Sequence, residues 1–206
     1  MVANNSFQFS KRDFFIVVLF ILFFPIKTQF YNATYVLFDA LITDGQISEV
    51  FTYNYLGYLL GCFEIQQLQE SLGSKFDDFN LIVNISLFIV AVVSWYMLKN
   101  RTSTKKNFNL VDWVLLALFS FSLVDSLEFL LEFFNNISVY IIDIKKQVFR
   151  ILVNTSILFL AGYLFFKCFN VTIKKNILYI VFPASIISFV VWFFYLGPMI
   201  LPIVTK

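Results

Sequence analysis

Three carboxylates stand inside an apolar stretch of this chain, at a spacing that suits one face of a helix. Asp125, Glu128 and Glu132 lie three and four residues apart within the apolar run 110–134. On an α-helix this spacing places the three side chains in one acidic stripe. A charged residue near the centre of a membrane-spanning helix costs about 2.5–3.5 kcal/mol, so the stripe needs a polar partner or a cavity.

A second group of polar residues opens the next apolar run. Arg150 begins this run and Asn154 follows one turn later. If the two runs form an antiparallel hairpin, Arg150 enters the membrane where Glu132 leaves it. We therefore expect a Glu132–Arg150 ion pair, and a hydrogen bond from Asn154 to Glu128. Three roles stay open for this set: an interhelical polar network, a proton or cation path, or contact with a partner subunit.

Arg150 and Asn154, four residues apart in an apolar helix, are similar to the arginine–asparagine pair of the proton-conducting subunit a of rotary ATP synthases. The resemblance covers five residues. It implies that Arg150 would face a rotor carboxylate. That family follows the pair with further polar groups, including a glutamine or an acid near the end. Ile177–Lys206 contains neither.

The composition shows which solvent the chain needs. Of its 206 residues 60% are hydrophobic and only 14% are charged, and the mean hydropathy is +0.82. Soluble domains are about 45–50% apolar and about 25% charged, so the surplus apolar surface predicts a lipid bilayer as partner. The net charge of +2 lacks the basic excess that nucleic-acid binding needs.

Residue types also exclude much chemistry. The chain has no histidine and two isolated cysteines, Cys62 and Cys168. Haem held by histidine, Cys/His zinc sites, histidine triads and CxxC redox pairs all need residues that are missing. We therefore predict no cofactor, no metal and no catalytic residue, although a carboxylate metal site stays possible.

The hydropathy pattern predicts an all-α, polytopic integral membrane helix bundle in one domain, 1–206. About 20 apolar residues span the hydrocarbon layer. The expected spans are 14–34, 81–98, 110–134, 151–169 and 177–204. Lys27 should snorkel to the head groups, and Gly197-Pro198 should break the last span.

An acidic, aromatic outer region, 35–80, separates the first two spans. Within it, Phe51–Phe63 is apolar and rich in tyrosine but too short to cross the membrane comfortably. Tyrosine suits the head-group layer. We therefore expect one interfacial or re-entrant helix here, either packed on its neighbours or acting as a lid.

The cations predict an orientation, because Lys and Arg gather on the inner side of a membrane. Five spans place three cation clusters on one side: Lys11 and Arg12, then those of 99–106, then Lys174 and Lys175. This predicts a cytoplasmic or matrix N-terminus in a bacterial or organellar inner membrane. Lys145 and Lys146 fall on the outer side and fit less well. A signal peptide is the alternative for 14–26, but no small-residue cleavage pattern follows it.

These features leave three functions open. The simplest is a non-catalytic subunit of a larger membrane complex, with partner subunits or further copies of the same chain. The second is a proton- or cation-translocating protein that uses Asp125, Glu128, Glu132, Arg150 and Asn154. The third is a membrane enzyme acting on lipid, with an acid of the stripe as general acid or base. No recognisable catalytic set favours the third.

Overall fold

The computed structural model describes residues 10–50, 52–57, 59–60, 70–102, 107–135 and 144–202. These residues form long helices and one short β-hairpin. The elements of the first half of the chain are α1 (Lys11–Ile21), α2 (Phe23–Ile42), α3 (Gln46–Val50), β1 (Thr52–Tyr53), β2 (Leu59–Leu60) and α5 (Ser74–Thr102). Those of the second half are α6 (Leu110–Asn135), α8 (Ile144–Tyr163), η1 (Leu164–Cys168), α9 (Val171–Asn176), η2 (Ile177–Val181), α10 (Phe182–Val191), η3 (Trp192–Leu196) and α11 (Gly197–Ile200).

The predicted helical membrane architecture is confirmed. Four helices are long and apolar enough to cross a bilayer: Ser74–Thr102, Leu110–Phe134, Val148–Cys168 and Val171–Ile200. The bent pair α1 and α2 makes a fifth if it counts as one span. Large apolar side chains such as Phe159 and Phe166 lie about three-quarters exposed on the outside of the bundle, where lipid can cover them. The chain is a multi-pass integral membrane protein.

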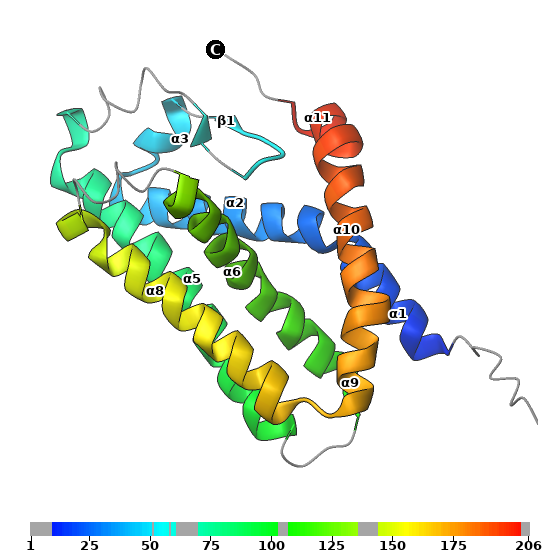
Figure 1. Cartoon of the computed structure of the whole chain (residues 1–206). Coiled ribbons are helices and arrows are strands. Elements are labelled where there is room, and N and C mark those ends of the chain that lie inside the picture. The colour runs from blue at the N-terminus through cyan, green and yellow to red at the C-terminus, as the bar shows by residue number, and fades with distance from the viewer. Residues whose placement is uncertain are drawn as a thin grey trace, which may run out of the picture.

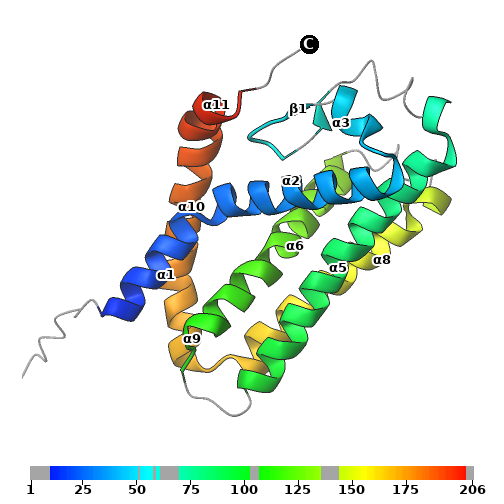
Figure 2. The same ribbon diagram turned by 180° about the vertical axis from the view of Figure 1, so that it is seen from behind.

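The described helix ends gather at two opposite ends of the bundle (Figures 1 and 2). The start of α1, the end of α5 and α9 lie at one end, here called the basic end. Its cations are Lys11, Arg12, Lys99, Arg101, Lys167, Lys174 and Lys175. Helix α3, the hairpin and the end of α11 lie at the other end, here called the acidic end, and α2 crosses the bundle on that side.

The first span is broken where a proline forces it. Helix α1 ends at Ile21 and α2 begins at Phe23, with a bend of 54° between them. Pro25 cannot donate a hydrogen bond to the carbonyl of Ile21, and its ring would clash with that carbonyl in a straight helix. In lipid each freed backbone group needs a partner. Ser188 of α10 supplies one, because its Oγ accepts the N–H of Phe24 at 3.1 Å.

The expected break at Gly197-Pro198 is wrong. The last span is continuous from Val171 to Ile200. Instead, a wider π-helical turn precedes each proline: η2 lies before Pro183 and η3 lies before Pro198. A π turn shifts the hydrogen bonding by one residue, which accommodates the missing N–H without a sharp kink.

The described part of the tyrosine-rich segment, residues 52–57 and 59–60, forms a hairpin and not the expected interfacial or re-entrant helix. Strands β1 and β2 pair antiparallel, with Thr52 opposite Leu60. The turn between them is fixed by Asn54, whose side-chain oxygen accepts the N–H of Leu56 at 2.8 Å and whose carbonyl accepts that of Gly57 at 3.1 Å. Gly57 has a φ of +73°, which glycine adopts without strain. Asparagine and glycine therefore make a turn where apolarity alone suggested a helix.

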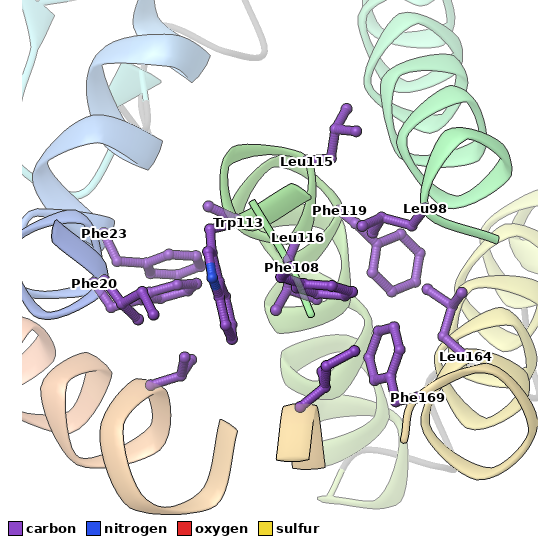
Figure 3. Packing of buried hydrophobic residues seen from close by; sticks show 14 of the residues in the cluster. Phe20, Phe23, Leu98, Phe108, Trp113, Leu115, Leu116, Phe119, Leu164 and Phe169 are labelled. Carbon is purple, nitrogen blue, oxygen red and sulfur yellow. The ribbon is translucent and has the colours of Figure 1, made fainter. Parts of the chain in front are cut away.

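An aromatic cluster fills the bundle near the basic end (Figure 3). Trp113 of α6 stands edge-on to Phe20 of α1 and to Phe108, with ring centroids 6.5 and 5.0 Å apart. Phe108 in turn meets Phe169 at 5.4 Å. These rings join α1, α6 and the end of η1 into one dry core.

The turn from α5 to α6 is fixed at the basic end by a buried carboxylate. Asn109 and Asp112 cap α6 reciprocally: the Asp112 N–H donates to the Asn109 side chain at 3.0 Å, and the Asn109 N–H donates to the Asp112 carboxylate at 2.8 Å. Arg101, at the end of α5, forms an ion pair with Asp112. This arrangement sets the register of α6 against α5 and therefore the depth of the acidic stripe.

Candidate functional site

A polar cavity of about 560 Å³ lies between α2, α5, α6 and α8, towards the acidic end. Its charged lining comes from three helices, and its neutral polar lining adds asparagine, serine and tyrosine side chains. The polar lining residues are Lys27, Tyr31, Tyr35, Asn80, Asn84, Ser122, Asp125, Ser126, Glu128, Glu132, Arg150 and Asn154. Apolar groups such as Phe88 and Ile157 complete the wall. A cavity this polar is unusual inside a bundle whose outer surface is apolar.

The five residues singled out from the sequence all line this cavity: Asp125, Glu128, Glu132, Arg150 and Asn154. The first three belong to α6 and the last two to α8, and the two helices pack against each other. The spacing of three and four residues on α6 brings its acids to one face. The packing of α8 against α6 brings Arg150 and Asn154 to the same cavity.

Asp125 has two partners from α2 that our sequence analysis did not predict. Lys27 Nζ lies 2.7 Å from Asp125 Oδ1, and the Tyr31 hydroxyl donates a hydrogen bond to Asp125 Oδ2. Lys27 also lies 4.6 Å above the Tyr31 ring. The expectation that Lys27 snorkels to the head groups is wrong: its side chain is 15% exposed and turns into the cavity, because a carboxylate lies within its reach.

Asn154 connects α8 to α6 through a neighbour of the acidic stripe. Its Oδ1 accepts the hydroxyl of Ser126 at 3.0 Å, and its Nδ2 donates to the backbone carbonyl of Arg150 at 2.7 Å. The expected hydrogen bond from Asn154 to Glu128 is therefore replaced by a bond to Ser126, which precedes Glu128 on α6. The Glu132–Arg150 ion pair stays a prediction.

Glu128 differs from its neighbour Asp125. Within the described part of the chain it forms neither a hydrogen bond nor an ion pair, although its carboxylate lines the same cavity. It is the acid of the stripe that is open to a proton, a cation or water entering the cavity. Arg150 stands nearby on α8, over the ring of Phe129 at 5.4 Å.

Aromatic rings close the cavity towards the basic end. Phe121, 2% exposed, packs against Tyr31 and Phe30, with ring centroids 6.4 and 5.8 Å apart. On its other side it meets Phe23 at 5.1 Å, which stacks on Phe20. The Phe121 ring thus lies between Tyr31, which lines the polar cavity, and the aromatic core shown in Figure 3.

The β-hairpin reaches the opposite side of the cavity and is fastened to two spans. Gly57 of its turn lines the cavity. The carbonyl of Tyr55 accepts a hydrogen bond from Trp192 Nε1 at 2.9 Å and one from Thr28 Oγ1 at 3.3 Å. The N–H of Tyr55 donates to the carbonyl of Leu201 at 3.1 Å. The hairpin is therefore held by α2 and by the end of the last span.

Gly197 is the position where this contact is tightest. A Cβ added there would lie 2.5 Å from the Trp192 carbonyl oxygen and 2.7 Å from Tyr55 Cβ. We expect Gly197→Ala to lower the free energy of unfolding by about 1–3 kcal/mol through overpacking, measured by thermal unfolding in detergent. Gly162→Ala is the control, because a Cβ at Gly162 meets no atom within 4 Å; it should raise stability by about 0.5–1 kcal/mol. Equal shifts in the two variants would contradict the close contact.

The described residues contain no group of three Cys, Asp or Glu side chains arranged to hold a metal ion. Cys168 is a free thiol, and Cys62 lies outside the described residues. The chemistry that the cavity does offer is that of carboxylates, an ammonium, a guanidinium and amides at short range. Such a set binds and exchanges protons and small ions.

The fold and this cavity together define a class: a multi-pass helical membrane protein with a charged cavity inside its bundle. No family model, no curated protein and no solved structure matches the chain.

Proposed function

We propose that this chain is a proton- or cation-translocating membrane protein and that the charged cavity is its binding site. The observation that carries the proposal is the set of Asp125, Glu128 and Glu132 facing one cavity inside the bundle. Charged side chains are costly within a membrane, and where they face a cavity they mark ion and proton pathways. An interhelical network would need the acids to be paired across helices, and Glu128 has no such pair within the described residues.

The broken first span supports the same function. Discontinuous helices beside a central polar site are typical of secondary transporters, where they allow one part of the bundle to move against another. The break at Leu22 lies next to Phe23, which belongs to the aromatic core, and α2 carries Lys27 into the cavity. A movement at this break would shift both the closed side of the cavity and the partner of Asp125.

The aromatic contact beside the cavity supports one kind of transport. Phe121, Phe23 and Phe20 pack ring against ring and are all buried. We therefore infer alternating access, in which the aromatic contact opens after the ion has bound, rather than a permanent pore. By the excess of Lys and Arg, the basic end with the N-terminus faces the cytoplasm or matrix, so the cavity is accessible from the outer side of an inner membrane.

Flux in liposomes tests this function. The purified chain is reconstituted with an internal pH dye, and a potassium gradient with valinomycin sets the membrane potential; sodium and potassium gradients are run in parallel. We expect flux above that of empty liposomes, and its loss in Glu128→Gln. Glu70→Gln is the matched control, because it makes the same chemical change at an exposed acid outside the cavity. Absent flux in the parent chain, or unchanged flux in Glu128→Gln, would overturn the proposal.

A further inference from the structure

A second hollow lies at the basic end, on the outer surface of the bundle and away from the charged cavity. It is a groove between the last turns of α5 and the α8–η1 junction. Beside the aliphatic Leu160, its side chains are cationic or aromatic: Trp95, Lys99, Phe159, Tyr163, Phe166 and Lys167. None of these residues lines the charged cavity, so the groove is a separate candidate site.

Two lysines stand at the rim of the groove. Lys99 Nζ lies 5.2 Å from the Trp95 ring centroid and 5.6 Å from that of Tyr163. In the described part of the chain neither Lys99 nor Lys167 has an acid within ion-pair distance. Two described acids at this end, Asp13 and Asp112, are already paired with Arg12 and Arg101. Among the described residues, therefore, no carboxylate forms an ion pair with either of the two lysines that the groove holds beside its aromatic rings.

The side chains of the groove follow one another along the helix axis in the order cationic, then apolar. Lys99 lies three residues before the end of α5, about 4.5 Å along the axis, and Lys167 lies in the last turn of η1. Phe159 lies two turns deeper on α8, about 12 Å from Lys167 along the axis, and is 75% exposed. The groove thus offers cations at its rim and an apolar wall below them, in the order in which a phospholipid presents phosphate and hydrocarbon.

The local backbone keeps the groove open. Gly162 lines it without a side chain, and a Cβ there would meet no other atom within 4 Å. The π turn of η1 follows directly, closed by a hydrogen bond from the Phe169 N–H to the Leu164 carbonyl at 2.9 Å. Such a widened turn changes the direction of the side chains beyond it, and it carries both Phe166 and Lys167.

We propose that this groove binds one anionic phospholipid of the leaflet at the basic end. The phosphate lies between Lys99 and Lys167, and an acyl chain lies along Phe159 and Phe166. Basic pockets between spans recognise negatively charged head groups through charge complementarity. A zwitterionic lipid carries its own cation and gains less from the two lysines. The site uses other residues than the proposed transport function does, so a failure of one proposal leaves the other unaffected.

Native mass spectrometry of the full chain in detergent tests the site. The protein is incubated with phosphatidylglycerol, with phosphatidylcholine of the same acyl chains, or with inorganic phosphate. We expect one phosphatidylglycerol to be retained preferentially, and this preference to be lost in Lys99→Gln/Lys167→Gln. Lys175→Gln, which removes an exposed cation at the same end outside the groove, should keep it.

Equal retention of the two lipids by the parent chain would overturn the proposal. A preference unchanged in the double variant would overturn it as well, since the charge would then act from elsewhere. If the double variant does not fold, Lys167→Gln alone at the exposed rim position should weaken retention while the protein stays folded. Retention of inorganic phosphate in place of the lipid would show an anion site without lipid specificity and would also overturn it.

Discussion

Replacing Asp125 with Asn is expected to lower the free energy of unfolding by about 1–3 kcal/mol, between the values for exposed and for fully buried ion pairs, since the Asp125 side chain is 35% exposed. The reason is the position of Lys27, whose ammonium group is 2.7 Å from the carboxylate and whose side chain is 15% exposed. Without Asp125 the ammonium group stays inside the bundle with no opposite charge in contact. The Tyr31 hydroxyl can still donate to the amide oxygen of the substituted side chain, so that hydrogen bond does not add to the loss.

A double-mutant cycle separates this structural effect from transport. Lys27→Met in the Asp125→Asn background removes the unpaired charge and keeps the apolar stem, so most of the lost stability should return. Flux should not return, because the acid is still missing. Unfolding is followed by circular dichroism in mixed micelles with added denaturant. Strictly additive losses in the two single variants would show that Lys27 and Asp125 are not coupled.

Glu128→Gln is the contrasting variant on the same helix face. Glu128 has no hydrogen bond or ion pair within the described residues, so its neutralisation should change stability by no more than about 0.5 kcal/mol. The proposed function nevertheless expects its flux to be lost. The two substitutions are thus expected to differ in their effect on stability, while both abolish flux. A purely structural network would not produce this combination.

The sequence predicted the spans well because length and apolarity are local properties. The run beginning at Leu81 was recognised, but α5 begins earlier, at Ser74. Asp77 lies in its first turn, where a negative charge is stabilised by the helix dipole. A span predicted from hydropathy ends at the first polar residues. The helix itself can continue through them into the head-group layer.

The acidic face of α6 was predictable from the sequence, whereas its contact with α2 was not. A period near 3.6 places Asp125, Glu128 and Glu132 together on any helix. The contact between Tyr31 and Asp125 joins residues 94 positions apart, and it depends on how α2 crosses α6. One signal was present: Lys27, Tyr31 and Tyr35 recur every four residues and form a polar face on α2, which in an apolar span indicates a polar neighbour.

The hairpin was missed because two signals compete in the same segment. Apolarity and tyrosine at Phe51–Phe63 favour a helix at the membrane surface. Tyrosine and threonine also favour strands, and Asn54 with Gly57 favours a turn between them. The docking of the turn on Trp192 and Thr28 decides between the two, and these residues are distant in sequence. In a short apolar run, turn residues therefore indicate a hairpin more strongly than the hydropathy of the run indicates a helix.

Phe121→Ala is expected to open the closed side of the cavity. The ring is 2% exposed and contacts Phe23, Phe30 and Tyr31. Its removal from a packed core should lower the free energy of unfolding by about 3–5 kcal/mol. Water in the cavity would then lie against the next rings of the core. We therefore expect an increased passive proton leak down an imposed pH gradient, without any sodium or potassium gradient to drive it.

Phe182→Ala is the matched control, because it deletes the same ring from a position that is 62% exposed to the lipid side. Its stability should change by no more than about 0.5 kcal/mol, and its leak should equal that of the parent chain. Phe121→Leu keeps much of the apolar volume and should therefore leak less than Phe121→Ala at a smaller loss of stability. A folded Phe121→Ala protein that is as tight as the parent chain would show that Phe121 does not close the path, and the barrier would then have to lie at Phe20 and Trp113, nearer the basic end.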